Sequence, residues 1–477
     1  MTKALLTPDF CVIGAGSGGL TFAAGAAQMG ARVVLLEEKH MGGDCLNTGC
    51  VPSKALIAAA KAGYARTHAA DFGWESSTTP VDFDKVRTHI KEVIAAIAPQ
   101  DSVERFSALG VTVIEERGTF QDDRTVETAS YIIQAKRFVI ATGGKPLVPK
   151  IPGLEHVPFL TNETLFDVPH LPSHLAIIGG GPIGMEMAQA FRRLGSRVTV
   201  FEVSRVLPKD EPSLTAHLKE VLHEEGVDIH EHTRVTGVSR NDDGTLVSFE
   251  KTAGTPQTCR ASHLFMATGR DKNLAGLGLE KAKVSFSPRG IAVRPTLQTT
   301  NPKIYALGDC IEGPLFTHAA GYQAGIALRN TIFGLRTKAT TRMVPWVTYT
   351  DPELAHIGHT QEELQRQEIP YRVLEIPFTE NDRAQADRRT QGAIMVLVTP
   401  RGKILGVSIL GTHAGELIAP WILAMENGLS IGAVASTLLP YPTLSEISKK
   451  AAGAFYKDKL FSPFMRQVVT FLMGLKT

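Results

Sequence analysis

The sequence predicts an α/β fold with several domains, because a short buried strand, a glycine-rich turn and a helical stretch follow one another twice along the chain. The two apolar strands are residues 10–13 and 175–178, and each runs directly into a turn with several glycines. A chain of 477 residues is also too long for one hydrophobic core. We therefore expect two similar α/β units and further sequence that forms other domains.

The first glycine-rich turn has the spacing of a dinucleotide-binding turn. Gly14, Gly16 and Gly19 separate the first strand from an alanine-rich helical stretch at 20–29. Such glycines permit a tight turn, a close approach of backbone to a pyrophosphate, and close packing of helix on strand. We expect the phosphates at the helix N-terminus. Glu37, at the end of the next strand, is expected to accept hydrogen bonds from a ribose.

The second turn repeats this pattern with Gly179, Gly181 and Gly184, and the following strand ends at Glu202. A carboxylate at this position favours a free ribose 2′-hydroxyl, whereas an arginine suits a 2′-phosphate. Glu202 therefore favours NADH over NADPH, although Arg205 lies nearby in the sequence. The two units predict two Rossmann-like dinucleotide-binding domains.

Two dinucleotide sites in one chain indicate that one cofactor passes electrons to the other, and FAD is the expected occupant of the first site. Two segments of the form ATG, at 141–143 and 267–269, end strands that close the two dinucleotide regions. A further strand delivers Asp309, which is expected to hold the ribityl chain of a flavin.

Two of the five cysteines, Cys45 and Cys50, lie close together in the chain. In a regular α-helix five residues rise about 7.5 Å, whereas a disulfide allows roughly 4.4 to 6.8 Å between Cα atoms. The segment must therefore bend, and its glycines and Pro52 are residue types that permit bending. A helix N-terminus and Lys54 would both lower a thiol pKa.

These features predict a redox-active disulfide. A free cysteine pair and two ligands of a metal site are the alternatives. A zinc site would need two further cysteine or histidine ligands at short spacing, and the segment does not supply two, so we predict no metal centre. Cys11, Cys259 and Cys310 are isolated and are interpreted as small buried residues.

Several motifs together resemble one enzyme family. They are GGDCLNTGCVPSK at 42–54, the two glycine turns, the two ATG segments, IYALGDC at 304–310, VPWVTYTDPELAHIG at 344–358 and PYPTLSE at 440–446. Over residues 8–456 the chain resembles the pyridine nucleotide-disulfide oxidoreductases, the family of dihydrolipoamide dehydrogenase, glutathione reductase and mercuric reductase.

The resemblance implies a domain order and a homodimer with a shared active site. The expected order is an FAD-binding domain with the redox disulfide (1–150), an NAD(P)-binding domain (151–275), a central domain completing the FAD site (276–340), an α+β dimerisation domain (341–456) and a C-terminal amphipathic tail (457–477).

The resemblance also implies roles for individual residues. Cys45 would exchange with the substrate, and Cys50 would make the charge-transfer contact with the flavin. Lys54 and Glu186 match an ion pair that tunes the flavin ring, although Glu186 is also open to interpretation as a helix surface or capping acid. Further cofactor contacts are predicted at Gly43, Lys54, Gly118, Ala141, Thr142, Gly143, Gly269, Arg270, Phe316, Thr317 and His318.

One position departs from the disulfide-reducing members, which carry a general acid/base histidine where this chain has Tyr441. Glu446, which would orient that histidine, is retained, and it also fits a capping box opening a helix that runs to Phe455. With a pKa near 10, a tyrosine is a poor proton shuttle at neutral pH. In this segment the chain is similar to mercuric reductase, which also has a tyrosine there. Thiolates bind soft metal ions well.

We therefore predict an NADH-dependent flavoenzyme that reduces a small disulfide or a metal ion, similar to mercuric reductase. The ending FLMGLKT lacks the vicinal cysteine pair of that enzyme, which makes mercury a doubtful physiological substrate. Dihydrolipoamide dehydrogenase and a non-catalytic flavoprotein redox sensor are the alternatives.

The tail after Pro463 is predicted to be one helix with Phe464, Val468, Phe471 and Leu472 as its apolar residues. It is too short to span a bilayer. Docking on the dimer body and peripheral contact with a membrane are both open for it.

Composition adds two expectations. The net charge of +2, with both signs interspersed, gives no indication of a nucleic-acid footprint, and no nucleic-acid partner is expected. The N-terminal segment lacks a signal-peptide pattern, so a cytoplasmic location is expected.

Overall fold

The computed structural model describes residues 3–241, 244–251, 254–340 and 343–474. The chain divides into two compact units. The first unit consists of Met1–Gly179, Ala190–Phe201 and Thr233–Thr341, and the second of Gly180–Gln189, Glu202–His232 and Arg342–Thr477.

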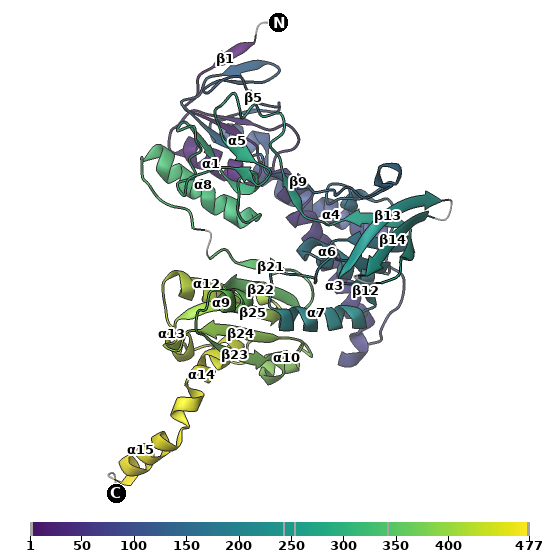
Figure 1. Cartoon of the computed structure of the whole chain (residues 1–477), viewed down its shortest axis with the longest axis vertical. Helices are drawn as coiled ribbons and strands as arrows, with labels where there is room; N and C mark the ends of the chain where they lie inside the picture. Colours follow the sequence, from purple (N-terminus) through teal and green to yellow (C-terminus); the bar gives the residue numbers. More distant parts are fainter. Residues whose placement is uncertain (1–2, 242–243, 252–253, 341–342, 475–477) are drawn as a thin grey trace. The chain divides into compact units, whose positions relative to one another are not determined.

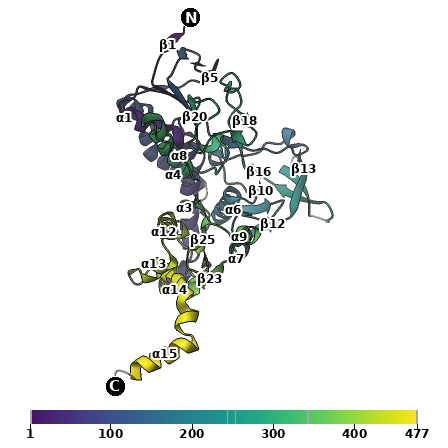
Figure 2. The same cartoon turned by 60° about the vertical axis from the view of Figure 1, so that its left-hand side comes forward.

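The first unit contains a five-stranded parallel sheet, which lies near the labelled helices α1 and α8 in Figure 1. Its strand order is β20-β8-β2-β3-β4, and every neighbouring pair is parallel. Strand β2 carries four consecutive buried residues, as expected for a strand covered on both faces. Helices α1 and α8 pack against each other beside the sheet (Figure 2). The bounds are β2 (Phe10–Ile13), α1 (Ser17–Gln28), β3 (Val33–Leu36), β4 (Val111–Ile114), β8 (Arg137–Ile140), β20 (Ile304–Ala306) and α8 (Thr317–Ile332).

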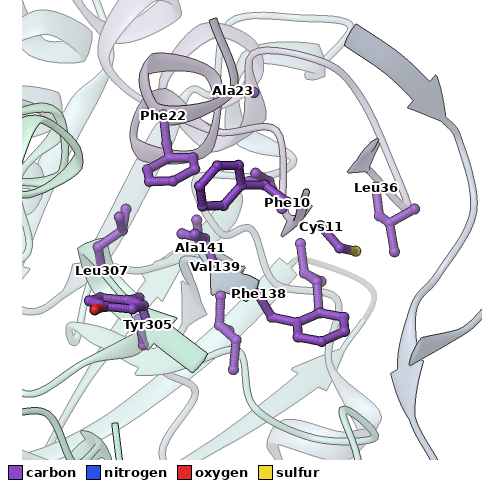
Figure 3. Packing of buried hydrophobic residues seen from close by; sticks show 14 of the residues in the cluster. Phe10, Cys11, Phe22, Ala23, Leu36, Phe138, Val139, Ala141, Tyr305 and Leu307 are labelled. Carbon is purple, nitrogen blue, oxygen red and sulfur yellow. The ribbon is translucent and has the colours of Figure 1, made fainter. Parts of the chain in front are cut away.

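The core of this unit is built from the buried side chains of these elements (Figure 3). The rings of Phe10 and Phe22 meet edge to face, with centroids 5.3 Å apart. Cys11 and Cys310 are fully buried, and burial raises the pKa of Cys310 to about 11. Their burial confirms that these two cysteines are interior residues, whereas Cys259 is only half-buried.

The second strand, turn and helix repeat the order of the first. Strand β10 (His174–Ile178) pairs in parallel with β11 (Arg197–Phe201) and with β16 (His263–Met266). Helix α6 (Pro182–Leu194) begins after the second glycine turn and has residues in both units. A three-stranded antiparallel sheet follows, of β13 (Thr233–Asn241), β14 (Gly244–Lys251) and β15 (Gln257–Ala261).

The remaining elements of the first unit surround these sheets. They are β1 (Ala4–Leu6), α2 (Gly43–Asn47), α3 (Cys50–Thr67), α4 (Phe83–Ile97), α5 (Val103–Ala108), β5 (Thr119–Phe120), β6 (Val126–Glu127), β7 (Tyr131–Ile133), β9 (Gly144–Pro146), β17 (Arg270–Lys272), β18 (Phe286–Ser287) and β19 (Gly290–Ile291).

The second unit is centred on a five-stranded antiparallel sheet with the order β21-β22-β25-β24-β23. Trp421 is fully buried, and its indole N–H donates to Ser448 Oγ at 3.0 Å, which joins α12 to α14. The bounds are α7 (Pro212–Glu224), β12 (Val227–His230), β21 (Trp346–Thr348), β22 (Glu353–Gly358), α9 (Gln361–Arg366), β23 (Arg372–Pro377), α10 (Asp382–Ala386), β24 (Ala393–Val398), β25 (Ile404–Gly411), α11 (Ala414–Leu417), α12 (Ala419–Glu426), α13 (Ile431–Ser436), α14 (Glu446–Leu460) and α15 (Pro463–Gly474).

The predicted strands are found, but several helices are longer than the sequence indicated. Helix α1 begins at Ser17 instead of residue 20, and α6 begins at Pro182 instead of residue 185. Both start directly after the glycine turn, and proline at the first helical position of α6 needs no hydrogen bond from its nitrogen. Helix α14 continues five residues beyond Phe455, to Leu460.

Gly19 tests how tightly the first turn is packed. A Cβ atom added there would lie 1.9 Å from the backbone oxygen of Gly14, whereas one added at Gly325 in α8 would meet no described atom within 4 Å. We expect Gly19→Ala to lower the free energy of unfolding by about 1–3 kcal/mol and Gly325→Ala to leave it unchanged or raise it slightly. Denaturant unfolding of both variants measures this, and equal stability would contradict the packing argument.

Candidate active site

The two glycine turns have the same backbone geometry. Gly14 has φ +104°, and a Cβ atom there would lie 2.4 Å from the carbonyl oxygen of Ala141. Gly179 has φ +115°, and its Cβ would lie 2.3 Å from the carbonyl oxygen of Ala267. The backbone of each ATG segment therefore lies in close contact with one turn, and only glycine fits at the position of the turn that it contacts.

The two acidic residues also make equivalent contacts. Glu37 accepts the backbone N–H of Ala15 at 2.7 Å and, through its other oxygen, the N–H two residues after itself at 2.8 Å. Glu202 likewise accepts from Gly180 at 2.7 Å and from the N–H two residues on at 2.9 Å. Both carboxylates therefore shape their turns, and their contact with a ribose stays a prediction.

An open cavity lies beside the first turn, and four predicted cofactor residues line it: Gly14, Glu37, Gly118 and Thr142. A Cβ added at Gly16 would meet no described atom within 4 Å, so the backbone at the start of α1 faces open space. The described first turn of α1 carries no acidic side chain. Unopposed helix N–H groups attract an anion, so this part of the site fits the pyrophosphate of FAD.

The cysteine segment is attached directly to this turn. The N–H of Gly42 donates to the carbonyl oxygen of Ala15 at 3.0 Å. Gly43 has φ +59°, and a Cβ there would lie 2.8 Å from the Cα atom of Gly16. Helix α2 thus starts in backbone contact with the first turn, and Cys45 lies in this short helix.

Cys50 is the first residue of α3, and its sulfur lies 3.4 Å from the hydroxyl oxygen of Thr317, the first residue of α8. A hydrogen bond from the Cys45 thiol, then Thr317 and the positive charge of Lys54, lowers the pKa of Cys50 to about 6, although burial opposes this. The same hydrogen bond raises the pKa of Cys45. Both side chains are free thiols here, and this arrangement places the negative charge of the reduced pair on Cys50.

A polar network surrounds the start of α2. Asp44 accepts from Thr48 Oγ1 at 2.8 Å and Asn162 Nδ2 at 2.9 Å, and it forms an ion pair with Arg270 at 3.0 Å. The Nε atom of Arg270 lies 3.3 Å from Asp309. Burial raises the pKa of Asp309, and the charge of Arg270 opposes that shift. Two residues predicted to bind a cofactor, Arg270 and Asp309, are therefore brought together.

Sequence reasoning missed Asp44 and Asn162. The position of Asp44 inside the cysteine segment could have identified it as a site residue. Asn162 lies 118 positions from Asp44, and no local motif marks it.

Other residues predicted to bind a cofactor lie at the start of α8, in the second glycine turn, in the ATG segments, and in α6 and α3. The rings of Phe316 and His318 stack with centroids 5.2 Å apart on either side of Thr317. A Cβ at Gly181 would meet no described atom within 4 Å, which repeats the open space at Gly16. Gly143 and Gly269, the last residues of the two ATG segments, have φ +68° and +117°. Gly184 lies in α6, and Lys54 is the fifth residue of α3.

Glu186 is buried in the second unit, and its Oε1 atom accepts the backbone N–H of Tyr349 at 2.9 Å. Burial excludes the alternative of an exposed surface acid. The ion pair between Lys54 and Glu186 stays a prediction.

Tyr441 is 69% exposed, and its hydroxyl donates to Asp382 Oδ2 at 3.0 Å. This hydrogen bond and the carboxylate charge raise the pKa of Tyr441. Asn381 Nδ2 donates to the carbonyl oxygen of Thr443 at 3.1 Å, which ties the start of α10 to the segment after Tyr441. Asp382 was not identified from the sequence, because it lies 59 positions from Tyr441.

The predicted capping box at Glu446 forms only in part. Glu446 Oε2 accepts the N–H of Thr443 at 3.4 Å, which is the carboxylate half of the motif. The Thr443 hydroxyl donates instead to the carbonyl oxygen of Pro440 at 2.9 Å, and α14 begins at Glu446 itself. The predicted hydrogen bond from the Glu446 N–H to the Thr443 hydroxyl was wrong, because this hydroxyl is used in the tight turn that leads into the helix.

Two family profiles match the chain. The profile described as pyridine nucleotide-disulphide oxidoreductase covers residues 8–324, and the profile described as its dimerisation domain covers residues 344–452. The chain belongs to the pyridine nucleotide-disulphide oxidoreductase family. It is therefore an oxidoreductase that binds FAD and NAD(P)H, and the dimerisation domain supports a homodimer.

Relatives within the family carry different names. A mercuric reductase of Streptomyces lividans is 34% identical over 458 residues, which cover 94% of this chain and 96% of the relative. A dihydrolipoyl dehydrogenase of Bacillus subtilis (strain 168) is 33% identical, with 93% and 95% covered. The HOCl-induced flavoprotein disulfide reductase RclA from Escherichia coli, solved as a Cu(II) complex, is 26% identical with a TM-score of 0.83, covering 92% of this chain and 98% of that one.

The hydroxyl of Thr317 tests what stabilises the Cys50 thiolate. Thr317→Val in the reduced enzyme should raise the pKa of Cys50 above about 6, so that less thiolate is present at neutral pH. Ser53→Ala is the matched control, because the Ser53 hydroxyl donates to the backbone oxygen of Cys50 and not to its sulfur. The pH dependence of thiolate absorbance measures both. An unchanged titration in Thr317→Val would contradict the assigned role.

Proposed function

We propose that this protein passes electron pairs from NADH, through bound FAD and the Cys45–Cys50 disulfide, to a disulfide or metal-ion acceptor. The observation that carries the proposal is the cysteine pair on α2 and α3, because its segment contacts the backbone of the first turn and the Cys50 sulfur lies 3.4 Å from the Thr317 hydroxyl oxygen. Gly14, Gly16 and Gly19 would hold FAD at the first turn, and the flavin would supply two-electron transfer between NADH and the disulfide.

The chain's own residues determine where the charges go. Reduction breaks the Cys45–Cys50 bond, and one proton is taken up by Cys45 while Cys50 keeps the negative charge. Thr317 and Lys54 stabilise that charge. Transfer to a disulfide acceptor then requires Cys45 to lose its proton, attack one sulfur and release the other as a thiol. Attack by Cys50 on the mixed disulfide re-forms the Cys45–Cys50 bond and releases the second thiol.

The Tyr441 segment favours an acceptor that needs little proton transfer. A base for the Cys45 proton works best with a pKa near the operating pH, whereas the Asp382 carboxylate raises the pKa of Tyr441 even further. A soft metal ion bound by the Cys50 thiolate would also coordinate Cys45 and release its proton to water, because a metal-bound thiol is deprotonated without a base. The two thiolates would then pass an electron pair to the metal ion and re-form the Cys45–Cys50 bond. A mercuric-reductase-like reaction, as the name of the Streptomyces relative suggests, is therefore our first choice.

Dihydrolipoamide dehydrogenase is the second candidate, because relatives of that name are as similar along almost the whole chain. A non-catalytic redox sensor is the third, and the assembled cysteine pair argues against it.

We also propose that NADH is preferred over NADPH. Glu202 holds a carboxylate at the end of β11, where it would repel a 2′-phosphate. Arg205, the residue that could favour NADPH, is engaged elsewhere. Its guanidinium forms an ion pair with Glu362 at 3.0 Å and donates to the carbonyl oxygen of Pro208 at 2.9 Å.

Anaerobic titration of the purified holoenzyme with NADH tests the electron path. We expect a long-wavelength charge-transfer band, because a thiolate at Cys50 beside the flavin would produce one. The band should be lost in Cys50→Ala and kept in Cys259→Ala, a half-buried cysteine on β15. Mixing the reduced enzyme with lipoamide, glutathione disulfide and Hg(II) then identifies the acceptor class. No band in the unmodified protein would reject the proposed path.

The coenzyme preference is tested with Glu202→Gln, which keeps an acceptor oxygen but removes the charge. We expect the ratio of kcat/KM for NADH over NADPH to fall roughly tenfold, equivalent to about 1.4 kcal/mol. Glu362→Gln is the control, because it weakens the partner of Arg205 and leaves Glu202 in place. A ratio that moves only in Glu362→Gln would assign the preference to Arg205 instead.

A further inference from the structure

Helix α15 exposes a large amount of apolar surface. None of its described residues, 463–474, is buried. Figures 1 and 2 show α15 beyond the end of α14, away from the five-stranded sheet of the same unit. Its exposed large apolar residues are Phe464 (70%), Val469 (47%), Phe471 (67%), Leu472 (52%) and Met473 (68%). Apolar surface gathered in this way indicates an interaction site.

Four apolar residues of α15 lie on one side of the helix, whereas Val469 and Met473 lie outside this face. Phe464, Val468, Phe471 and Leu472 recur at the spacing of one helical face, and Arg466 and Thr470 fall on the opposite side. An amphipathic helix of this kind needs an apolar surface to cover one side and water on the other.

The charge around α15 has one sign. Residues 459–477 contain three basic residues and no acidic residue. Asp458, just before this segment, forms an ion pair with Arg372 at 3.0 Å, and the residue before it is Lys457. A surface that binds α15 should therefore offer an apolar layer to the apolar side chains and negative charge to the basic ones. An anionic lipid surface has both, in its acyl chains and its headgroups.

The length of α15 decides how it would meet a bilayer. Its 12 residues rise about 18 Å, well below the roughly 30 Å of a hydrocarbon core. Among the described helices of the chain, none has the length and apolar character to cross a membrane. The helix would lie in the plane of the lipid headgroups.

We propose that α15 is an interfacial helix that attaches the enzyme to anionic lipid. A second copy of the chain is the competing occupant. The matched dimerisation domain ends at residue 452, before α15 begins. A contact between two α15 helices across a two-fold axis would also bring like charges together. The proposal concerns location and does not depend on which acceptor the enzyme reduces.

Co-sedimentation of the holoenzyme with vesicles tests the proposal. The vesicles are phosphatidylcholine alone and phosphatidylcholine with one quarter phosphatidylglycerol. We expect binding to the anionic vesicles at least roughly tenfold stronger than to the neutral ones, and weaker at high salt. The double variant Phe464→Ser, Phe471→Ser should lose binding. Trp74→Ser is the control, because Trp74 is 76% exposed but lies outside the tail.

Light scattering of the same variants distinguishes the two occupants. The lipid proposal requires the tail variant and a chain lacking residues 463–477 to keep the dimer mass, flavin content and NADH oxidation in solution. Equal vesicle binding by all variants, or no binding by the unmodified enzyme, would overturn it. A dimer that dissociates when the tail is changed would assign α15 to the second copy.

Discussion

The close backbone approach of Gly42 and Gly43 to the first glycine turn is the constraint on which the candidate active site depends. The hydrogen bond from Gly42 to Ala15 and the lack of room for a Cβ at Gly43 fix the start of α2 against the turn. Because α2 carries one cysteine and α3 begins with the other, both cysteines directly follow the segment that contacts the first turn. A side chain at Gly43 would clash with the backbone of Gly16 and displace the start of α2.

The chain uses one turn design twice. In both copies a glycine with positive φ meets the carbonyl oxygen of an ATG segment, and a carboxylate 23 residues later accepts two backbone N–H groups. These carboxylates organise the turn before any ligand is bound, so the backbone N–H groups are preorganised for phosphate. The difference between the copies lies in what is attached to them. Only the first turn carries the cysteine segment.

Acid–base chemistry is where this chain departs from the disulfide-reducing pattern. The tyrosine hydroxyl is oriented by Asp382 on α10, whereas Glu446 is used to close the turn that leads into α14. A carboxylate partner on Tyr441 strengthens its hold on the proton. Under the proposed function, a tyrosine that keeps its proton and a thiolate at Cys50 both fit an acceptor that binds the sulfurs directly.

Local motifs determined the α/β class, both dinucleotide turns, the cysteine pair and the residues of the ATG segments, because each depends on residues adjacent in sequence. The family relationship followed from the same motifs. Contacts between distant segments could not be predicted in this way. Thr317 against Cys50, Asn162 on Asp44 and Asp382 on Tyr441 join residues separated by 267, 118 and 59 positions. Their pairing depends on how helices and strands pack, and side-chain hydrogen bonds form only after that packing has brought the partners together. The sequence by itself therefore determined the cysteine pair and the two glycine turns, and the tertiary structure decided which distant side chains contact them, because those contacts exist only once the chain is packed.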